Sequence, residues 1–279
     1  MLLKENLLCI LEGKEDIASL DFKDWLFSDD AFGKNAQIDN IKKWIRYMAV
    51  DYGDADIVLK KGKILEKLNW NTQWIDCIYS FKTYFNAFLR FYLNGKKETY
   101  GYILDHYDEI FSQSKKKQFA KEREINLQLL ISLFNELNSF ALYTHTIGNY
   151  MPCPDGDYNS IKGFYGYKYF QDRLDLLYSE LLCPKHLDYQ KLNEEKRASY
   201  KKWLDDNKTI LHIENLLKND KLNYLCKSKQ NGCYHIYIMN DKEDLKNFLN
   251  YLKEINLLIK NRGLTIEKEL KENLLEKRN

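Results

Sequence analysis

Proline is confined to one segment of this chain. All three prolines, Pro152, Pro154 and Pro184, lie between residues 143 and 185, and so do four of the twelve glycines. Because proline breaks a helix and glycine weakens one, the remainder is free to form long helices. Its apolar residues recur at steps of three and four, which places them on one helix face. The sequence therefore predicts a mainly α-helical fold with an ordered central loop over 143–169.

Several regions carry the helical spacing clearly. A helix over 71–94 would begin at Asn71 or Thr72 as cap, and Gly95 would end it. The capping-box pattern at 240–243 predicts the start of a C-terminal helix, which Gly263 would end. The predicted helices cover residues 38–48, 71–94, 115–138, 170–182 and 243–263.

The chain changes character once, near its C-terminal end. Two stretches rich in β-branched and aromatic residues, 222–226 and 233–239, flank the Asn231-Gly232 turn signal. This pattern predicts a small β-hairpin packed on helices. Two domains are then expected, 1–188 with the central loop and 189–279 with the hairpin. Because the connecting residues are helical in composition, one continuous domain over 1–279 is the alternative.

Composition limits the class of protein. A hydrophobic fraction of 44% with 30% charged residues excludes disorder as the main state. The formal charge of +2 does not match a dedicated nucleic-acid binder. The sequence has no uncharged apolar run of about 20 residues and no signal peptide, and its six cysteines form no Cys-x-x-Cys pair. We expect a cytoplasmic protein with reduced thiols, without membrane contact, cofactor or metal.

Polar residues gather in the central loop, where a metal site is one interpretation. Asp155, Asp157 and Asn159 alternate as the first ligands of a calcium loop do, but Gly166 stands where that loop needs a bidentate glutamate. A hydrolytic site would instead use His145 to activate water beside Asp157. No paired-histidine spacing accompanies these residues.

The loop can also be interpreted as a structural or ligand-binding platform. Asn149 and Asn159 are the candidate polar contacts, and Arg173 could hold a carboxylate or phosphate with its planar fork. Alternatively, Arg173 pairs with Asp172 or Asp175 and fastens the loop to the next helix.

Basic residues form a candidate site outside the loop. Three of them open the helix predicted over 115–138: Lys115, Lys116 and Lys117. Such a cluster can hold phosphate groups, and a solvated helix face is the alternative. Cys226, Cys233 and His235 in the hairpin lack a fourth zinc ligand, so we expect buried thiols there.

Four short motifs follow one another across residues 144–176. They are Thr-Ile-Gly at 146–148, the pair Pro152 and Pro154, Asn-x-x-Lys-Gly at 159–163, and Asp-Arg-x-Asp-Leu at 172–176. In this order they resemble the core of an uncharacterised bacterial family, a domain of unknown function. Lys162 stands where that family has arginine. The resemblance implies no activity.

A second likeness concerns Ile147-Gly148-Asn149 followed by Asn159-Ser160. These residues are similar to the segment after the catalytic residues in His-Asn-His nucleases of restriction systems that cleave modified DNA. Such nucleases also carry a catalytic histidine in an upstream strand, and the candidate here is His106. This likeness implies metal-assisted cleavage of nucleic acid.

Two classes of function follow. The first is a non-enzymatic bacterial or phage protein that binds a macromolecule, either protein or nucleic acid, with phage–host conflict as a suggested setting. The second is a metal-assisted phosphodiesterase centred on 145–173. The near-neutral charge and the missing nucleophile and metal-ligand motifs favour the first class.

Overall fold

The computed structural model describes residues 17–22, 39–50, 68, 70, 74–155, 181, 193–217, 229–230, 233–234 and 242–276. Of the residues it describes, 71% are helical, which confirms the mainly α-helical fold. The helices are α2 (Asn40–Val50), α5 (Phe81–Tyr92), α6 (Tyr100–Asp105), α7 (Tyr107–Ile110), α8 (Gln113–Glu122), α9 (Leu127–Tyr143), α13 (Glu194–Asn207), α14 (Glu214–Leu217) and α15 (Lys242–Glu276). A 3-10 turn, η1, covers Ile147–Asn149.

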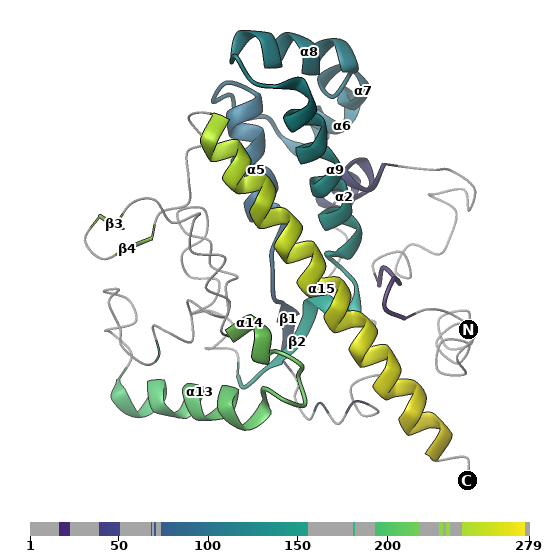
Figure 1. Ribbon diagram of the computed structural model, residues 1–279, viewed down its shortest axis with the longest axis vertical. Coiled ribbons are helices and arrows are strands. Elements are labelled where there is room, and N and C mark those ends of the chain that lie inside the picture. The colour runs from purple at the N-terminus through teal and green to yellow at the C-terminus, as the bar shows by residue number, and fades with distance from the viewer. Residues whose placement is uncertain are drawn as a thin grey trace.

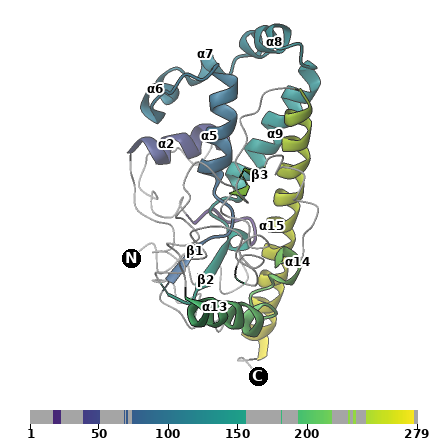
Figure 2. The ribbon, with the colours of Figure 1, turned by 90° about the vertical axis from the view of Figure 1, so that its left-hand side faces the viewer.

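Helix α15 runs the length of the molecule (Figure 1). It lies beside α9 in both ribbon views (Figures 1 and 2). Its inner face also packs against η1. One hydrophobic core includes buried residues from Ile17, near the N-terminus, to Leu270 in α15. Helix α15 therefore shares a core with the segments that precede the central loop.

Aromatic side chains of α5 fill much of this core. Phe81, Phe85 and Phe88 are fully buried. Burial of each ring contributes about 1.5–3 kcal/mol. The rings also meet those of other helices: Phe88 lies edge-on to Phe134 of α9 at 5.0 Å, and Phe81 meets Trp44 of α2 at 4.7 Å. The aromatic stripe is therefore packing, as its spacing predicts.

The start predicted for the 71–94 helix is wrong. Strand β1 (Trp74–Cys77) occupies its first part and pairs antiparallel with β2 (Tyr150–Cys153). A helical spacing of four separates Trp74 from Ile78, but the Ile78 amide donates to the Asn149 carbonyl at 2.6 Å, which extends the strand pairing. Helix α5 begins only at Phe81. Gly95, with φ of 82°, follows the end of α5 as predicted.

Two other helix boundaries also differ from the prediction. The 115–138 helix is two helices, α8 and α9, because Glu124 takes a left-handed conformation with φ of 52° between them. The Asn126 side chain then caps α9 by accepting from the Gln128 amide at 2.7 Å. Gly263 does not end the C-terminal helix, which continues to Glu276.

The predicted hairpin turn is confirmed, but the described strand before it covers 229–230, closer to the turn than the predicted stretch 222–226, which lies outside the described residues. Strands β3 (Lys229–Gln230) and β4 (Cys233–Tyr234) pair antiparallel and flank the Asn231-Gly232 signal. Its packing on helices, the boundary between 188 and 189, and all of the 170–182 helix except Leu181 lie outside the described residues.

Candidate functional site

The first half of the central loop is an ordered and buried turn. Asn149 is fully buried, and each polar atom of its side chain is bonded to the backbone. Its Oδ1 accepts from the Tyr79 amide at 3.0 Å, while Nδ2 donates to the carbonyls of Tyr79 and Thr144, both at 2.9 Å. The side chain predicted to bind a ligand therefore joins the end of α9 to the residues after β1.

Helix α15 presses closely on this turn. A Cβ at Gly148 would lie 2.1 Å from the Ile259 carbonyl oxygen and 3.0 Å from the Gly263 nitrogen. Beside it, the buried Arg262 donates from Nη1 to the Gly148 and Tyr150 carbonyls, both at 2.7 Å. Glycine at 148 thus permits backbone contact with the helix, and Arg262 fixes that contact.

His145 lies in a buried polar cluster next to the turn. Its Nδ1 is 3.6 Å from an Asp21 carboxylate oxygen, and the other oxygen of Asp21 is 3.2 Å from Lys43 Nζ. The Tyr47 ring packs edge-on against the imidazole. His145 is 8% exposed, so its described neighbours leave little room for a substrate at the ring.

Other predicted site residues cannot be placed beside His145. Asp157, Asn159 and Arg173 lie outside the described residues. His106, the upstream nuclease candidate, is exposed at the junction of α6 and α7 and not in a strand, and it stacks on Tyr102 at 4.2 Å. Among the described residues no group of three His, Cys, Asp or Glu side chains is arranged to hold a metal ion.

A cleft of about 860 Å³ lies between α2 and the α6–α9 region; we call it the α2 cleft. This volume is typical of small-ligand sites. Four cationic side chains line it, three of them from α2: Lys42, Lys43, Arg46 and Lys116. Two carboxylates, Asp39 and Asp108, also line it, so positive charge predominates at its wall.

Lys116 is the member of the predicted lysine cluster that enters the cleft. It is half-buried, and its ammonium lies 4.2 Å from the centre of the Phe134 ring. Burial lowers the pKa of Lys116, and the nearby Asp39 carboxylate opposes that shift. Lys116 has no ion-pair partner among the residues described, so its charge is held close to an apolar wall without a neutralising contact.

The two carboxylates of the cleft are already engaged. Asp39 caps α2 by accepting from the Ile41 amide at 2.9 Å, and it is hydrogen-bonded to the Tyr107 side chain. Burial, with added repulsion from Asp39, raises the pKa of Tyr107, so the phenol stays protonated. Asp108 binds Lys42 Nζ at 3.0 Å. Among the described residues, both carboxylates therefore have other partners, and Lys116 forms no ion pair.

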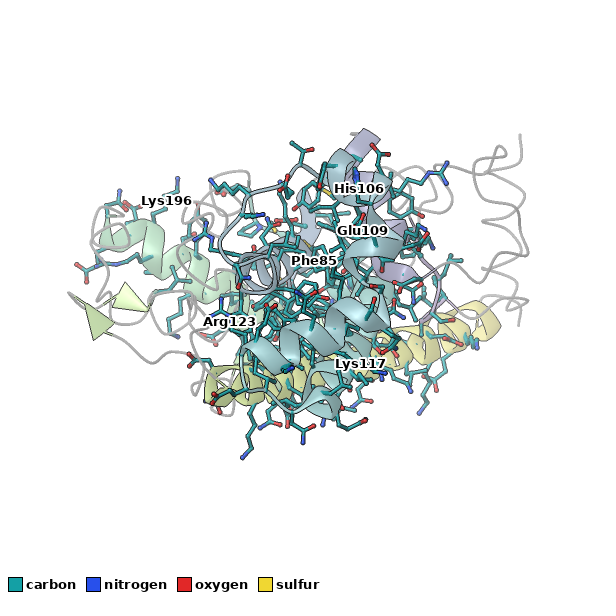
Figure 3. The ribbon with its side chains drawn as sticks, turned by 90° about the horizontal axis from the view of Figure 1, so that it is seen from above. Phe85, His106, Glu109, Lys117, Arg123 and Lys196 are labelled. Atoms are coloured by element: carbon teal, nitrogen blue, oxygen red, sulfur yellow. The ribbon has the colours of Figure 1, made fainter. Side chains whose placement is uncertain are left out.

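Lys115 and Lys117 differ from Lys116 in exposure. Both are exposed and neither lines the cleft; the view from above labels Lys117 on α8 (Figure 3). Sequence reasoning missed Lys42, Lys43 and Arg46. Their spacing of one, three and four residues on a helix face was an available signal, but that they face Lys116 follows only from the tertiary structure.

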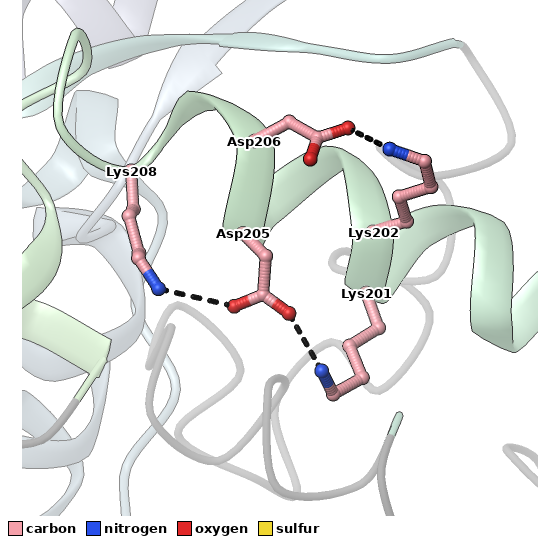
Figure 4. A network of polar contacts seen from close by, with 5 residues as sticks. All are labelled: Lys201, Lys202, Asp205, Asp206 and Lys208. Carbon is pink, nitrogen blue, oxygen red and sulfur yellow. Dashed lines mark hydrogen bonds and ion pairs between the residues drawn. The ribbon is translucent and has the colours of Figure 1, made fainter.

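Three lysines in and just after α13 are neutralised by nearby carboxylates. On α13, Lys201 pairs with Asp205 at 2.6 Å and Lys202 pairs with Asp206, each one turn apart, and Lys208 also reaches Asp205 (Figure 4). Pairs of this kind add a few tenths of a kcal/mol to a helix and suggest no ligand.

No helix that the structure describes is long and apolar enough to cross a bilayer. The α2 cleft combines a ligand-sized volume with a half-buried cation that has no ion-pair partner among the described residues. Its geometry has to carry the functional inference, because no family model, curated protein or solved structure matches this chain.

Proposed function

We propose that this is a non-enzymatic binding protein whose α2 cleft recognises a phosphate-bearing ligand. The observation that carries the proposal is Lys116: a half-buried ammonium, without an ion pair among the described residues, at the wall of a cleft of about 860 Å³. An anion beside it would offset the desolvation of its charge. Charge-assisted hydrogen bonds of this type are about twice as strong as neutral ones.

The other residues of the cleft support an anion more than a cation. Asp39 already accepts from a backbone amide and bonds Tyr107, and Asp108 is held by Lys42. Arg46 lines the same wall and carries the planar fork that suits phosphate. A phosphate beside Lys116 would therefore meet a cationic wall whose two carboxylates already have other partners.

Phosphate groups occur on free nucleotides and along nucleic acids, and the cleft chemistry is common to both. The direct test is a fluorescence anisotropy titration with labelled single-stranded RNA, labelled single-stranded DNA and a fluorescent ATP analogue. We expect binding of at least one probe, with an affinity that falls as salt rises. Binding of the ATP analogue without binding of either oligonucleotide would indicate a nucleotide site.

Adjacent lysines provide the matched control. Lys116→Gln removes the charge inside the cleft, and Lys117→Gln removes an equal charge from the exposed face of α8. We expect Lys116→Gln to weaken binding at least tenfold, from the loss of a charged hydrogen bond worth about 1.5–3 kcal/mol, and Lys117→Gln to change it little. Equal effects of the two substitutions, or no binding of any probe, would contradict the proposal.

A metal-assisted phosphodiesterase centred on His145 is the second candidate. It is favoured by the Asp21 carboxylate, 3.6 Å from His145 Nδ1, whose charge would stabilise the imidazolium that a general base becomes. Incubating labelled DNA and RNA with the protein, with and without Mg²⁺ or Mn²⁺, tests it. Cleavage that His145→Asn abolishes and Lys117→Gln leaves intact would favour the enzyme over the binding protein.

A further inference from the structure

A second hollow, of about 710 Å³, lies where the C-terminal end of α2 meets α5 and the start of α6; we call it the α5 groove. Apolar side chains from all three helices line it: Met48, Ala49, Leu89, Leu93 and Ile103. The polar residues Asn86 and Tyr100 lie among them, and the Tyr100 hydroxyl donates to Asn86 Oδ1 at 2.8 Å. The groove therefore has an apolar lining whose main polar groups are bonded to each other.

Four exposed cations also belong to the lining of the α5 groove: Lys82, Arg90, Lys96 and Lys97. None of them pairs with a carboxylate in the part of the chain that the structure describes, unlike the lysines of α13 in Figure 4. Glu98 is the one acidic residue among the groove's described lining. The groove is thus both apolar and strongly positive.

The positive charge is spread along the groove. Lys82, Asn86, Arg90 and Leu93 recur at helical spacing on one face of α5. With a rise of about 1.5 Å per residue, Lys82 and Leu93 are about 16 Å apart along the helix axis. Lys96 and Lys97 follow beyond that end, after a turn that Gly95 permits with φ of 82°.

This turn is held in place by the neighbouring helix. Arg123, at the C-terminal end of α8, donates to Asn94 Oδ1 and lies over the Phe91 ring at 5.4 Å. Figure 3 labels Arg123 at the end of α8. The backbone that carries Lys96 and Lys97 is therefore positioned by contacts outside the groove, which lowers the entropic cost of binding a partner there.

We propose that the α5 groove binds an acidic, amphipathic segment of a partner protein. Its carboxylates would meet the cations at both ends, and its aliphatic or aromatic side chains would cover Met48, Ala49 and Leu93, which solvent still reaches. In a general mode of peptide recognition, the apolar face of the peptide enters a groove, and its charged residues meet residues of opposite charge at the rim of the groove. A helical segment of about 11 residues, or an extended one of about 5, covers 16 Å.

Two other classes of ligand fit less well. One small anion can contact the cations at one end only, because Lys82 and Arg90 alone are about 12 Å apart along the axis of α5. A nucleic acid supplies charges over that length, but its phosphates carry no apolar groups to cover the aliphatic lining. The combination of dispersed cations and aliphatic side chains therefore favours a peptide.

The test is a selection from a library of random 12-residue peptides displayed on phage, using the full chain as bait. Each round is counter-selected against the double variant Lys82→Glu with Arg90→Glu. We expect the retained peptides to combine Asp or Glu with Leu, Ile or Phe. Retained peptides that are basic or lack apolar residues, or the absence of any enrichment, would overturn the proposal.

Anisotropy with a fluorescein-labelled peptide from the selection then measures affinity. The matched control is Lys117→Glu with Lys121→Glu, which makes the same change in charge on exposed positions of α8. We expect at least tenfold weaker binding to the groove variant, and little change in the control or in Lys116→Gln. Circular dichroism melts verify that each variant is folded. An equal loss in control and groove variants, or an oligonucleotide that displaces the peptide competitively, would refute the assignment.

Discussion

Arg262 shows how one side chain can organise a turn distant in sequence. Its Nε donates to the Leu211 carbonyl at 2.8 Å, and Nη1 donates to carbonyls of η1 and β2. The guanidinium also faces the Trp70 ring at 5.6 Å. Burial lowers the pKa of Arg262 to about 9, so it is still charged at neutral pH. Carbonyl dipoles stabilise this buried charge, and no carboxylate among the described residues forms an ion pair with it.

Gly148 yields the prediction at this scale. In Gly148→Ala the new Cβ would meet the Ile259 carbonyl at 2.1 Å, so η1 must separate from α15. We expect a loss of about 3 kcal/mol or more in unfolding free energy, at the upper end for overpacked sites, measured by urea denaturation. The control is Gly101→Ala in α6, where the nearest atom to the new Cβ is 3.9 Å away. There alanine should be neutral or stabilising by up to about 1 kcal/mol, because glycine weakens a helix. Similar losses in both variants would show that contact with α15 is not the cause.

At the scale of elements, periodicity located the helices but not all of their ends. Sequence spacing alone gives α2, the buried stripe of α5 and the start of α15. It cannot give β1, because the strand exists through bonds to β2, more than 70 residues later in the chain. For the same reason it selects the lysine cluster but cannot say that only Lys116 faces α2.

The break between α8 and α9 is a local feature that a substitution can test. Glu124 is exposed and its φ of 52° lies in the left-handed region, which costs a non-glycine residue about 1 kcal/mol. Glu124→Gly removes this strain, but it also makes the unfolded chain more flexible, which favours unfolding. We expect a net rise of about 0.5 kcal/mol in the unfolding free energy. The same substitution at Glu122, the last residue of α8, should lower it by up to about 1 kcal/mol, because glycine weakens the helix and removes the bond from Gln118 Nε2. Chemical denaturation of the two variants compares them, and the same sign in both would contradict this explanation of the break.

For the whole molecule, the aromatic core sets the response to alkali. Burial raises the pKa values of Tyr92 and Tyr100 to about 12, against 10 for an unperturbed phenol. The unfolded chain therefore loses these protons first, between pH 10 and pH 12, and ionisation favours unfolding. We expect the stability contributed by the protonated phenols to be complete below pH 10 and to fall as the pH rises toward 12.

Absorbance at 295 nm, which follows phenolate formation, measures this directly. The wild-type titration should show tyrosines that ionise late, together with the loss of helical circular dichroism. Tyr100→Phe should remove one late-titrating group and make the alkaline fall in stability less steep. A titration in which every tyrosine ionises near pH 10 while the helices persist would show that the core does not protect these phenols.

The order in which the ribosome releases the chain gives α15 a further consequence. The Ala18 amide bonds to Glu267, 249 residues later, and the Gly148 carbonyl bonds to Arg262, 114 residues later. Contacts of such long separation slow folding. While the earlier residues are being synthesised, the inner faces of α9 and η1 have no α15 to cover them. The nascent protein should therefore expose apolar surface until α15 emerges, and it should depend on chaperones during that interval.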